Sequence, residues 1–258
     1  MTRSQRTLAT VAVALAVVSP AAAYLPPATA ILKRVAQRRA DVGLAAMEVR
    51  GTLTLSGEAA RRVSAATGLS LSGPDLAAPA LLLLKAPGRC RLELAPEGVP
   101  VASRPAVSVR SARAVGYRGL GDAPGAQALV DGLCTLLGDR GAGGIEPQRA
   151  IAQRLASHGI ALADVALGRL GGRVAWVLGG RPRDSRPQAW VDKQSFQPVR
   201  LVAQLAGSQR DVRLLDFGSP VAGDAFPRVV EVWSGNDLEA RFTAEKLTAN
   251  PKIPDAIF

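Results

Sequence analysis

The chain has 258 residues, of which 32 are Lys or Arg and 21 are Asp or Glu, so its formal net charge is +11. Aromatic residues make up only 4% of it, too few for a surface that stacks nucleic-acid bases, and the basic residues form no dense block. The composition therefore disfavours a nucleic-acid partner. The positive charge indicates either ordinary solvated arginines or a chain that works near an anionic membrane surface.

The N-terminus has the features of a secretory signal peptide. Arg3 and Arg6 precede an apolar run over 8–18, and Pro20 and three alanines then offer a small-residue cleavage site near Ala23. The alternative is an uncleaved membrane anchor, but a spanning helix needs about 20 apolar residues and this run is shorter. We therefore predict a cleaved signal peptide over 1–23 and a single exported domain over 24–258.

Helical and strand periodicities alternate along the domain. Helical spacing predicts an opening helix over 27–44 and two mid-chain helices over 126–137 and 147–158. Apolar residues that alternate with polar ones, with short turns between the segments, predict about eleven antiparallel strands. The predicted strands are 47–55, 63–71, 79–85, 90–94, 106–110, 173–178, 188–192, 199–206, 211–217, 228–233 and 238–247. We expect a mainly β (α+β) fold, in which the sheet curls and helices cover its concave apolar face.

The two cysteines, Cys90 and Cys134, leave two alternatives open. An even count in an oxidising compartment permits one disulfide, and two buried free thiols fit the sequence equally well.

Residue patterns typical of catalysis or metal binding do not occur. The single histidine, His158, ends a predicted helix, where a cation is favoured, and no G-x-S-x-G elbow accompanies it. One histidine and two distant cysteines form no zinc-type cluster, and the Gly-rich stretches 119–125 and 138–144 lack nucleotide-binding spacing. We therefore expect a non-enzymatic protein with no catalytic residue, no metal and no cofactor.

The C-terminal third contains the most specific sequence motifs. A hairpin over 189–200 is followed by Asp216-Phe217-Gly218, by 226–230 and by an ending that contains Asn250-Pro251-Lys252-Ile253-Pro254-Asp255. This succession resembles the LolA/LolB-like family of periplasmic carriers that sort outer-membrane lipoproteins. The resemblance covers 28–60 and 173–258, whereas the segment 61–172 has no clear match.

The resemblance implies an open, curved antiparallel half-barrel whose mouth is plugged by helices. It also implies a hydrophobic cavity that takes the acyl chains of a lipidated protein or phospholipid, and delivery partners at the inner and outer membranes. The chain lacks a lipid-attachment cysteine at the cleavage site, so it resembles the soluble shuttle of the family, and we expect a monomer. The alternative is an envelope sensor or interaction module of the same fold that regulates a membrane partner.

Strand alternation nominates one apolar surface for contact with lipid. Its members are Leu53, Leu55, Leu82, Leu84, Trp176, Leu201, Leu214, Val232 and Phe242. Trp190 either faces the cavity or packs over the hairpin. In carriers of this family an arginine on an early strand can latch the helices closed, and Arg50 is the closest candidate by position, although it lies on the polar side of its predicted strand.

Overall fold

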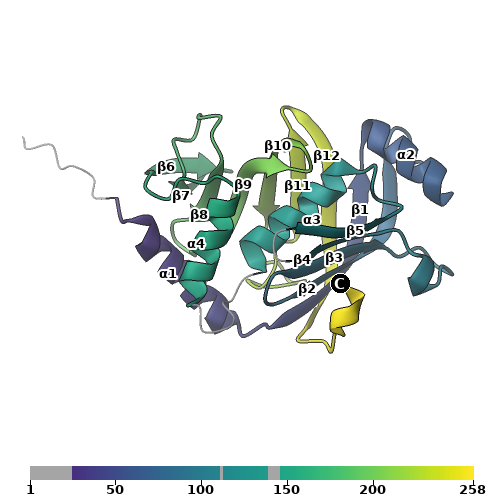
Figure 1. Ribbon diagram of the computed structural model, residues 1–258, viewed down its shortest axis with the longest axis horizontal. Helices are drawn as coiled ribbons and strands as arrows, with labels where there is room; N and C mark the ends of the chain where they lie inside the picture. The colour runs from purple at the N-terminus through teal and green to yellow at the C-terminus, as the bar shows by residue number, and fades with distance from the viewer. Residues whose placement is uncertain (1–24, 111–112, 139–145) are drawn as a thin grey trace, which may run out of the picture.

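A computed structural model describes residues 25–110, 113–138 and 146–258 (Figure 1). Within these ranges the chain forms one sheet of twelve strands and four α-helices. The helices are α1 (Ala28–Val42), α2 (Gly57–Thr67), α3 (Pro124–Leu137) and α4 (Pro147–Ser157). The predicted signal peptide lies outside the described residues.

Five strands precede α3 and seven follow α4. The first five are β1 (Ala46–Leu55), β2 (Leu76–Lys85), β3 (Arg89–Leu94), β4 (Ala106–Arg110) and β5 (Arg113–Arg118). The others are β6 (Val165–Leu170), β7 (Arg173–Leu178), β8 (Gln188–Asp192), β9 (Pro198–Leu205), β10 (Ser208–Leu215), β11 (Val229–Ser234) and β12 (Asp237–Ala249). Two short 3-10 helices, Val101–Ser103 and Asp255–Ile257, complete the described elements.

The sheet is one continuous antiparallel meander with the first and last strands at its centre. Its order is β5-β4-β3-β2-β1-β12-β11-β10-β9-β8-β7-β6, so β1 pairs with β12 while β5 and β6 form the two open edges. A twelve-stranded sheet with native twist curls, and this one forms an open half-barrel around helix α3 (Figure 1). The predicted fold class is confirmed.

One predicted strand was wrong, and two strands escaped prediction. The segment 63–71 belongs largely to helix α2, whose buried residues Ala60 and Val63 lie three residues apart and pack toward the sheet. Gly68 then ends the helix in the left-handed region, at φ 74°, and its N–H donates to the carbonyl of Ser64. The missed strands are β5 and β6, the two edges of the sheet.

Helix α3 fills the concave face. It contacts β3, β4 and β5 on one side and β9, β10, β11 and β12 on the other (Figure 1). Two glycines allow this close approach, since a Cβ at Gly125 would lie 2.8 Å from Cβ of Glu239, and one at Gly132 would lie 2.8 Å from Cγ2 of Val212. A disulfide between Cys134 on α3 and Cys90 on β3 ties the helix to the sheet covalently.

Helix α1 is attached differently. Its apolar face, which contains Ile31, Leu32 and Val35, is buried in the main core, and helix α4 packs against both α1 and α3. The opposite side of α1 carries Lys33 and Arg34, both exposed. Gly43 ends the helix at φ 70° and leads directly into β1.

Candidate functional site

The nine residues nominated for lipid contact share one buried cluster. Each has at most 8% of its surface exposed, and all nine belong to the core that surrounds α3. Only Leu84 among them lines the cavity described below. Helix α3 covers the face on which these residues lie. Their contact with lipid therefore stays a prediction.

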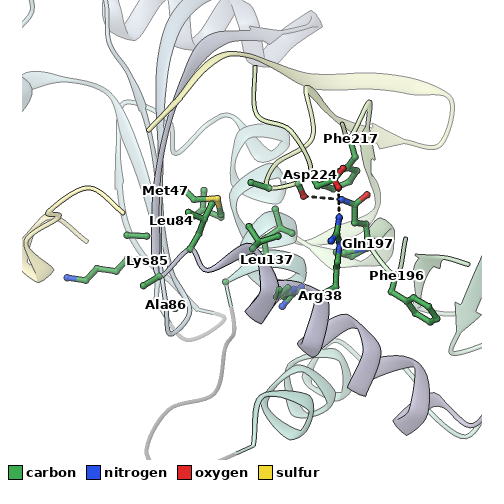
Figure 2. A pocket seen from close by; sticks show the side chains of 18 residues that line it. Arg38, Met47, Leu84, Lys85, Ala86, Leu137, Phe196, Gln197, Phe217 and Asp224 are labelled. Carbon is green, nitrogen blue, oxygen red and sulfur yellow. Dashed lines mark hydrogen bonds and ion pairs between the residues drawn. The ribbon is translucent and has the colours of Figure 1, made fainter. Parts of the chain in front are cut away.

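A small apolar cavity lies at one end of the half-barrel, beyond the last turn of α3. Met47 at the start of β1, Leu84 near the end of β2 and Leu137 at the end of α3 contribute to its wall (Figure 2). The wall is completed by Arg38, Arg39, Val42, Leu44, Ala45, Ala46, Lys85, Ala86, Gly138, Phe196, Gln197, Pro198, Phe217, Asp224 and Ala225. Its volume of about 50 Å³ holds a few water molecules and is far below the roughly 300 Å³ of a typical ligand pocket.

A side-chain tie closes the cavity between α1 and the loop that joins β10 to β11. The guanidinium of Arg38 donates a hydrogen bond to the carboxylate of Asp224, and the side-chain amide of Gln197 donates to the backbone carbonyl of Asp224 at 2.9 Å (Figure 2). The side chains of Arg38 and Asp224 are 38% and 50% exposed. Ion pairs with this much exposure are worth about 0–1 kcal/mol, so the tie holds α1 only weakly.

A second, polar groove adjoins the cavity on its outer side. It has a volume of about 370 Å³, and its residues are Arg34, Gln37, Arg38, Asp41, Gln194, Ser195 and Phe196. Arg38 and Phe196 line both spaces. Phe196 adopts the left-handed backbone region at φ 56°, which is uncommon for a non-glycine residue and fixes the lip of the groove.

Arg50 does not latch the helices in this structure. It lies on the face of β1 opposite the core, its side chain is 68% exposed, and its guanidinium pairs with Glu48 on the same strand at 3.0 Å. The correction follows from strand alternation, because Val49 and Gly51 occupy the inward positions on either side. A closing arginine does exist, but on α1 as Arg38.

The two cysteines form a disulfide rather than two free thiols. Cys90 and Cys134 have Cα atoms 5.7 Å apart and both are fully buried. The bond spans 44 residues of sequence and links β3 to the last turn of α3.

A buried polar cluster joins α3 to the end of α4. Thr135 Oγ1 shares a hydrogen bond with His158 Nε2 at 2.8 Å, and Asp131 Oδ1 lies 3.9 Å from the same nitrogen. Burial raises the pKa of Asp131 to about 6, against the opposing charge of Arg154. Burial, and then Arg154, lower the pKa of His158, which favours the neutral imidazole. His158 is a helix-end histidine with a buried side chain, and its ring is hydrogen-bonded to Thr135.

This cluster does not have the geometry of a hydrolase. Thr135 and Asp131 approach the same imidazole nitrogen of His158, whereas a triad places its nucleophile and its acid on opposite nitrogens. Thr135 is also fully buried, which leaves a substrate no approach to its hydroxyl.

Trp190 packs on the outer face of the sheet, away from the cavity. It forms a small cluster with Ala175 and Val177, its indole N–H donates to the side chain of Gln188 at 3.0 Å, and the guanidinium of Arg200 covers its ring at 4.7 Å. Of the two alternatives for Trp190, the structure therefore shows packing over the hairpin.

In the part of the chain that the structure describes, no three His, Cys, Asp or Glu side chains gather in an arrangement that suits a metal ion. None of the helices in those ranges combines the length and the apolar character that crossing a membrane requires.

Most of the residues that line the cavity and the groove, which together form the mouth of the half-barrel, were not identified from the sequence. Arg38 was recognisable only as a cation on the polar side of a helix, and Asp224 lies in a loop without periodicity, 186 residues away. Phe196 lies in the predicted hairpin over 189–200, but no sequence pattern indicates its left-handed backbone conformation. Leu137 lay at the end of a predicted helix and carried the clearest hint.

Comparisons with known proteins give only weak likenesses. A LolA superfamily protein from Nitrosomonas europaea shares 12% identity at a TM-score of 0.45, covering 91% of this chain and 98% of that one. A DUF1329 family protein from Desulfovibrio piger shares 10% at 0.39, over 90% and 97% of the two chains. A structure of the Pseudomonas aeruginosa MucA/MucB complex shares 17% at 0.27, over 90% and 60%. No family model and no curated protein matches the sequence. We therefore infer function from the geometry of this chain alone.

Proposed function

We propose that the chain is an exported, LolA-like binding protein that shields the acyl chains of a lipid or lipidated protein from water. The observation that carries this proposal is the apolar cavity at the mouth, which borders the core of the half-barrel and is closed on one side by an exposed ion pair. Each CH₂ group kept from water contributes about 0.8 kcal/mol, so even part of an acyl chain gives a large driving force.

Uptake requires the mouth to widen, because about 50 Å³ does not admit an acyl chain. Helix α1 is the element that we expect to move. It is held by noncovalent contacts, namely its buried apolar face and the Arg38–Asp224 pair, whereas α3 is also held by a disulfide and approaches the strands through two glycines. A ligand that binds only the widened state shifts the population toward it.

The disulfide supports an oxidising compartment, and with the signal-peptide prediction it favours the periplasm. There the protein would take cargo from a partner at one membrane and deliver it to another, as a shuttle.

A second candidate, an interaction module that senses the envelope, is favoured by one observation. The concave face is already filled by α3, most of whose residues are buried, so the core is packed without a ligand. Such a module would bind a protein partner through its surface and take up no acyl chain.

The experiment that separates the two candidates measures lipid in the native protein. Native mass spectrometry and lipid extraction are applied to protein purified from the periplasm, followed by titration with a neutral fluorescent alkyl probe. We expect copurified lipid and saturable probe uptake. Protein that carries no lipid and takes up no probe would contradict the carrier and support the interaction module.

A matched pair of variants locates the binding. Leu137→Trp places a larger side chain in the cavity from a half-buried position, whereas Leu71→Trp adds the same ring at a site that is 40% exposed and does not line it. We expect probe uptake to be lost in the first variant and kept in the second, with both folded by circular dichroism. Equal uptake by both would place binding elsewhere.

A further inference from the structure

Two spaces that differ in polarity meet at the mouth, and the outer groove is the more polar of the two. The inner cavity is mostly apolar, with Met47, Leu84 and Leu137 in its wall, and the outer groove is lined mainly by charged and polar side chains of α1 and of the turn between β8 and β9. Because Arg38 lines both, a single ligand that spans them needs an apolar part inside and a polar part outside. That shape is an amphiphile with one alkyl chain and a compact head.

The charge of the outer groove selects the sign of the head. Two cations, Arg34 and Arg38, and one acid, Asp41, line the groove. Helix α1 as a whole carries four cations against this one acid. Gln37 and Gln194 add side-chain amides that can donate hydrogen bonds, whereas the hydroxyl of Ser195 already donates to Asp192 Oδ1 at 2.9 Å. A carboxylate or phosphate is complementary to this set, whereas a cationic head is not.

We propose that the mouth recognises an anionic amphiphile, and that its head takes Arg38 from Asp224. This inference rests on the proposed function and names its ligand class. In the closed protein Arg38 donates to Asp224, a carboxylate that is half exposed. A ligand carboxylate in the outer groove offers the same guanidinium an equivalent acceptor, so binding of the head breaks the tie that holds α1 to the rim.

The exchange removes one of the contacts that hold α1 at the rim. Charge-assisted bonds to a guanidinium are roughly twice as strong as neutral ones, and the incoming anion replaces one such bond with another. The rim then loses its tie at little cost, and the alkyl chain gains access to the apolar wall. An uncharged amphiphile has to break the tie without this compensation.

The test compares dodecanoate with dodecanol by calorimetric titration at pH 8, where the acid is ionised. We expect the wild-type protein to bind dodecanoate about tenfold more tightly, a preference worth about 1.4 kcal/mol. Equal affinity for the two ligands would overturn anionic recognition while leaving the proposed function intact. Failure to bind either ligand would overturn the proposed function itself.

Two variants that both break the tie identify the anchor. Arg38→Gln removes the cation, so the preference for dodecanoate should disappear while dodecanol binds at least as well. Asp224→Asn removes the competing carboxylate, so the preference should persist and dodecanoate should bind more tightly than in the wild type. Arg61→Gln on α2, where the arginine pairs with Glu58, is the control for lost charge. A preference that survives Arg38→Gln would overturn the assignment of Arg38.

Discussion

Helices α3 and α1 both lie on the half-barrel, yet they are held by opposite means. Helix α3 is apolar almost all round, approaches the strands through two glycines and is joined to β3 by a disulfide. Helix α1 buries one apolar stripe and meets the rim through an exposed ion pair. This contrast is why we propose that α1 moves while α3 stays in place.

The largest expected effect comes from removing the disulfide between Cys90 and Cys134. In the chain-entropy account, a disulfide that spans 44 residues stabilises the folded state by about 3–4 kcal/mol. The double variant Cys90→Ala/Cys134→Ala should lose about that much free energy of unfolding in urea titrations. Wild-type protein in reductant is the control and should match the variant. Unchanged stability in both would remove the basis for calling α3 fixed.

The next effect concerns the carboxyl group of Asp131, which lies on α3. Burial raises the pKa of Asp131 to about 6, above its unfolded value, so its contribution to stability is fully present below about pH 4 and is lost as pH rises through 6. Asp131→Asn should therefore raise the free energy of unfolding by about 1–3 kcal/mol at pH 7.5, with the gain shrinking toward pH 4. His158, whose pKa is lowered, contributes the opposite slope, with stability lost as pH falls below its unfolded value.

Thermal and urea unfolding across this pH range measure the Asp131 effect. The exposed Asp122→Asn, just before α3, is the matched control and should show no such gain. If Asp131→Asn were destabilising at every pH, the carboxylate would have to be serving as a needed hydrogen-bond acceptor instead.

A smaller effect tests the close approach of α3 to β10. A Cβ at Gly132 meets Cγ2 of Val212 at 2.8 Å, so Gly132→Ala should cost about 1 kcal/mol after the gain in helix propensity is counted. The double-mutant cycle with Val212→Ala isolates the clash, and we expect a favourable coupling of about 1 kcal/mol. Strict additivity would show that the helix has room to shift.

The smallest expected change in stability belongs to α1. Arg38→Gln removes an exposed pair and should cost less than about 1 kcal/mol. Its effect should appear instead in hydrogen exchange, as faster exchange of α1 amides with α3 amides unchanged. Equal acceleration in both helices would mean that they open as one unit.

Most of the sheet could be predicted from the sequence, because alternation in β1, β10 and β12 follows from one buried face. Strands β7 and β8 are short apolar runs that are buried almost throughout, and such runs also indicate strands. The exceptions have physical causes. Strand β6 is an edge with an exposed Leu167 and a central Gly168, so alternation is weak there. The segment 63–71 carries apolar residues that fit both periods, and only packing against the sheet decides between them.

The site was less accessible to sequence reasoning than the fold. All nine nominated residues lie on the concave face, which the periodicity of two specifies locally. The mouth depends instead on contacts between distant segments, such as Arg38 with Asp224, and on the special backbone of Phe196. Neither feature produces a periodic pattern in the sequence, because a loop acid and a helix cation carry no information about their partner.

The pairing of β1 with β12 has a consequence for how the molecule is made. The two halves of the sheet join only through these strands, over a register that runs from Met47–Ala249 to Leu55–Ala240. During synthesis, which starts at the N-terminus, one side of β1 therefore stays unpaired until β12 has been made. Such distant contacts slow folding and leave partly built sheets prone to aggregate. A chaperone that keeps the chain unfolded until β12 has been made would protect this strand.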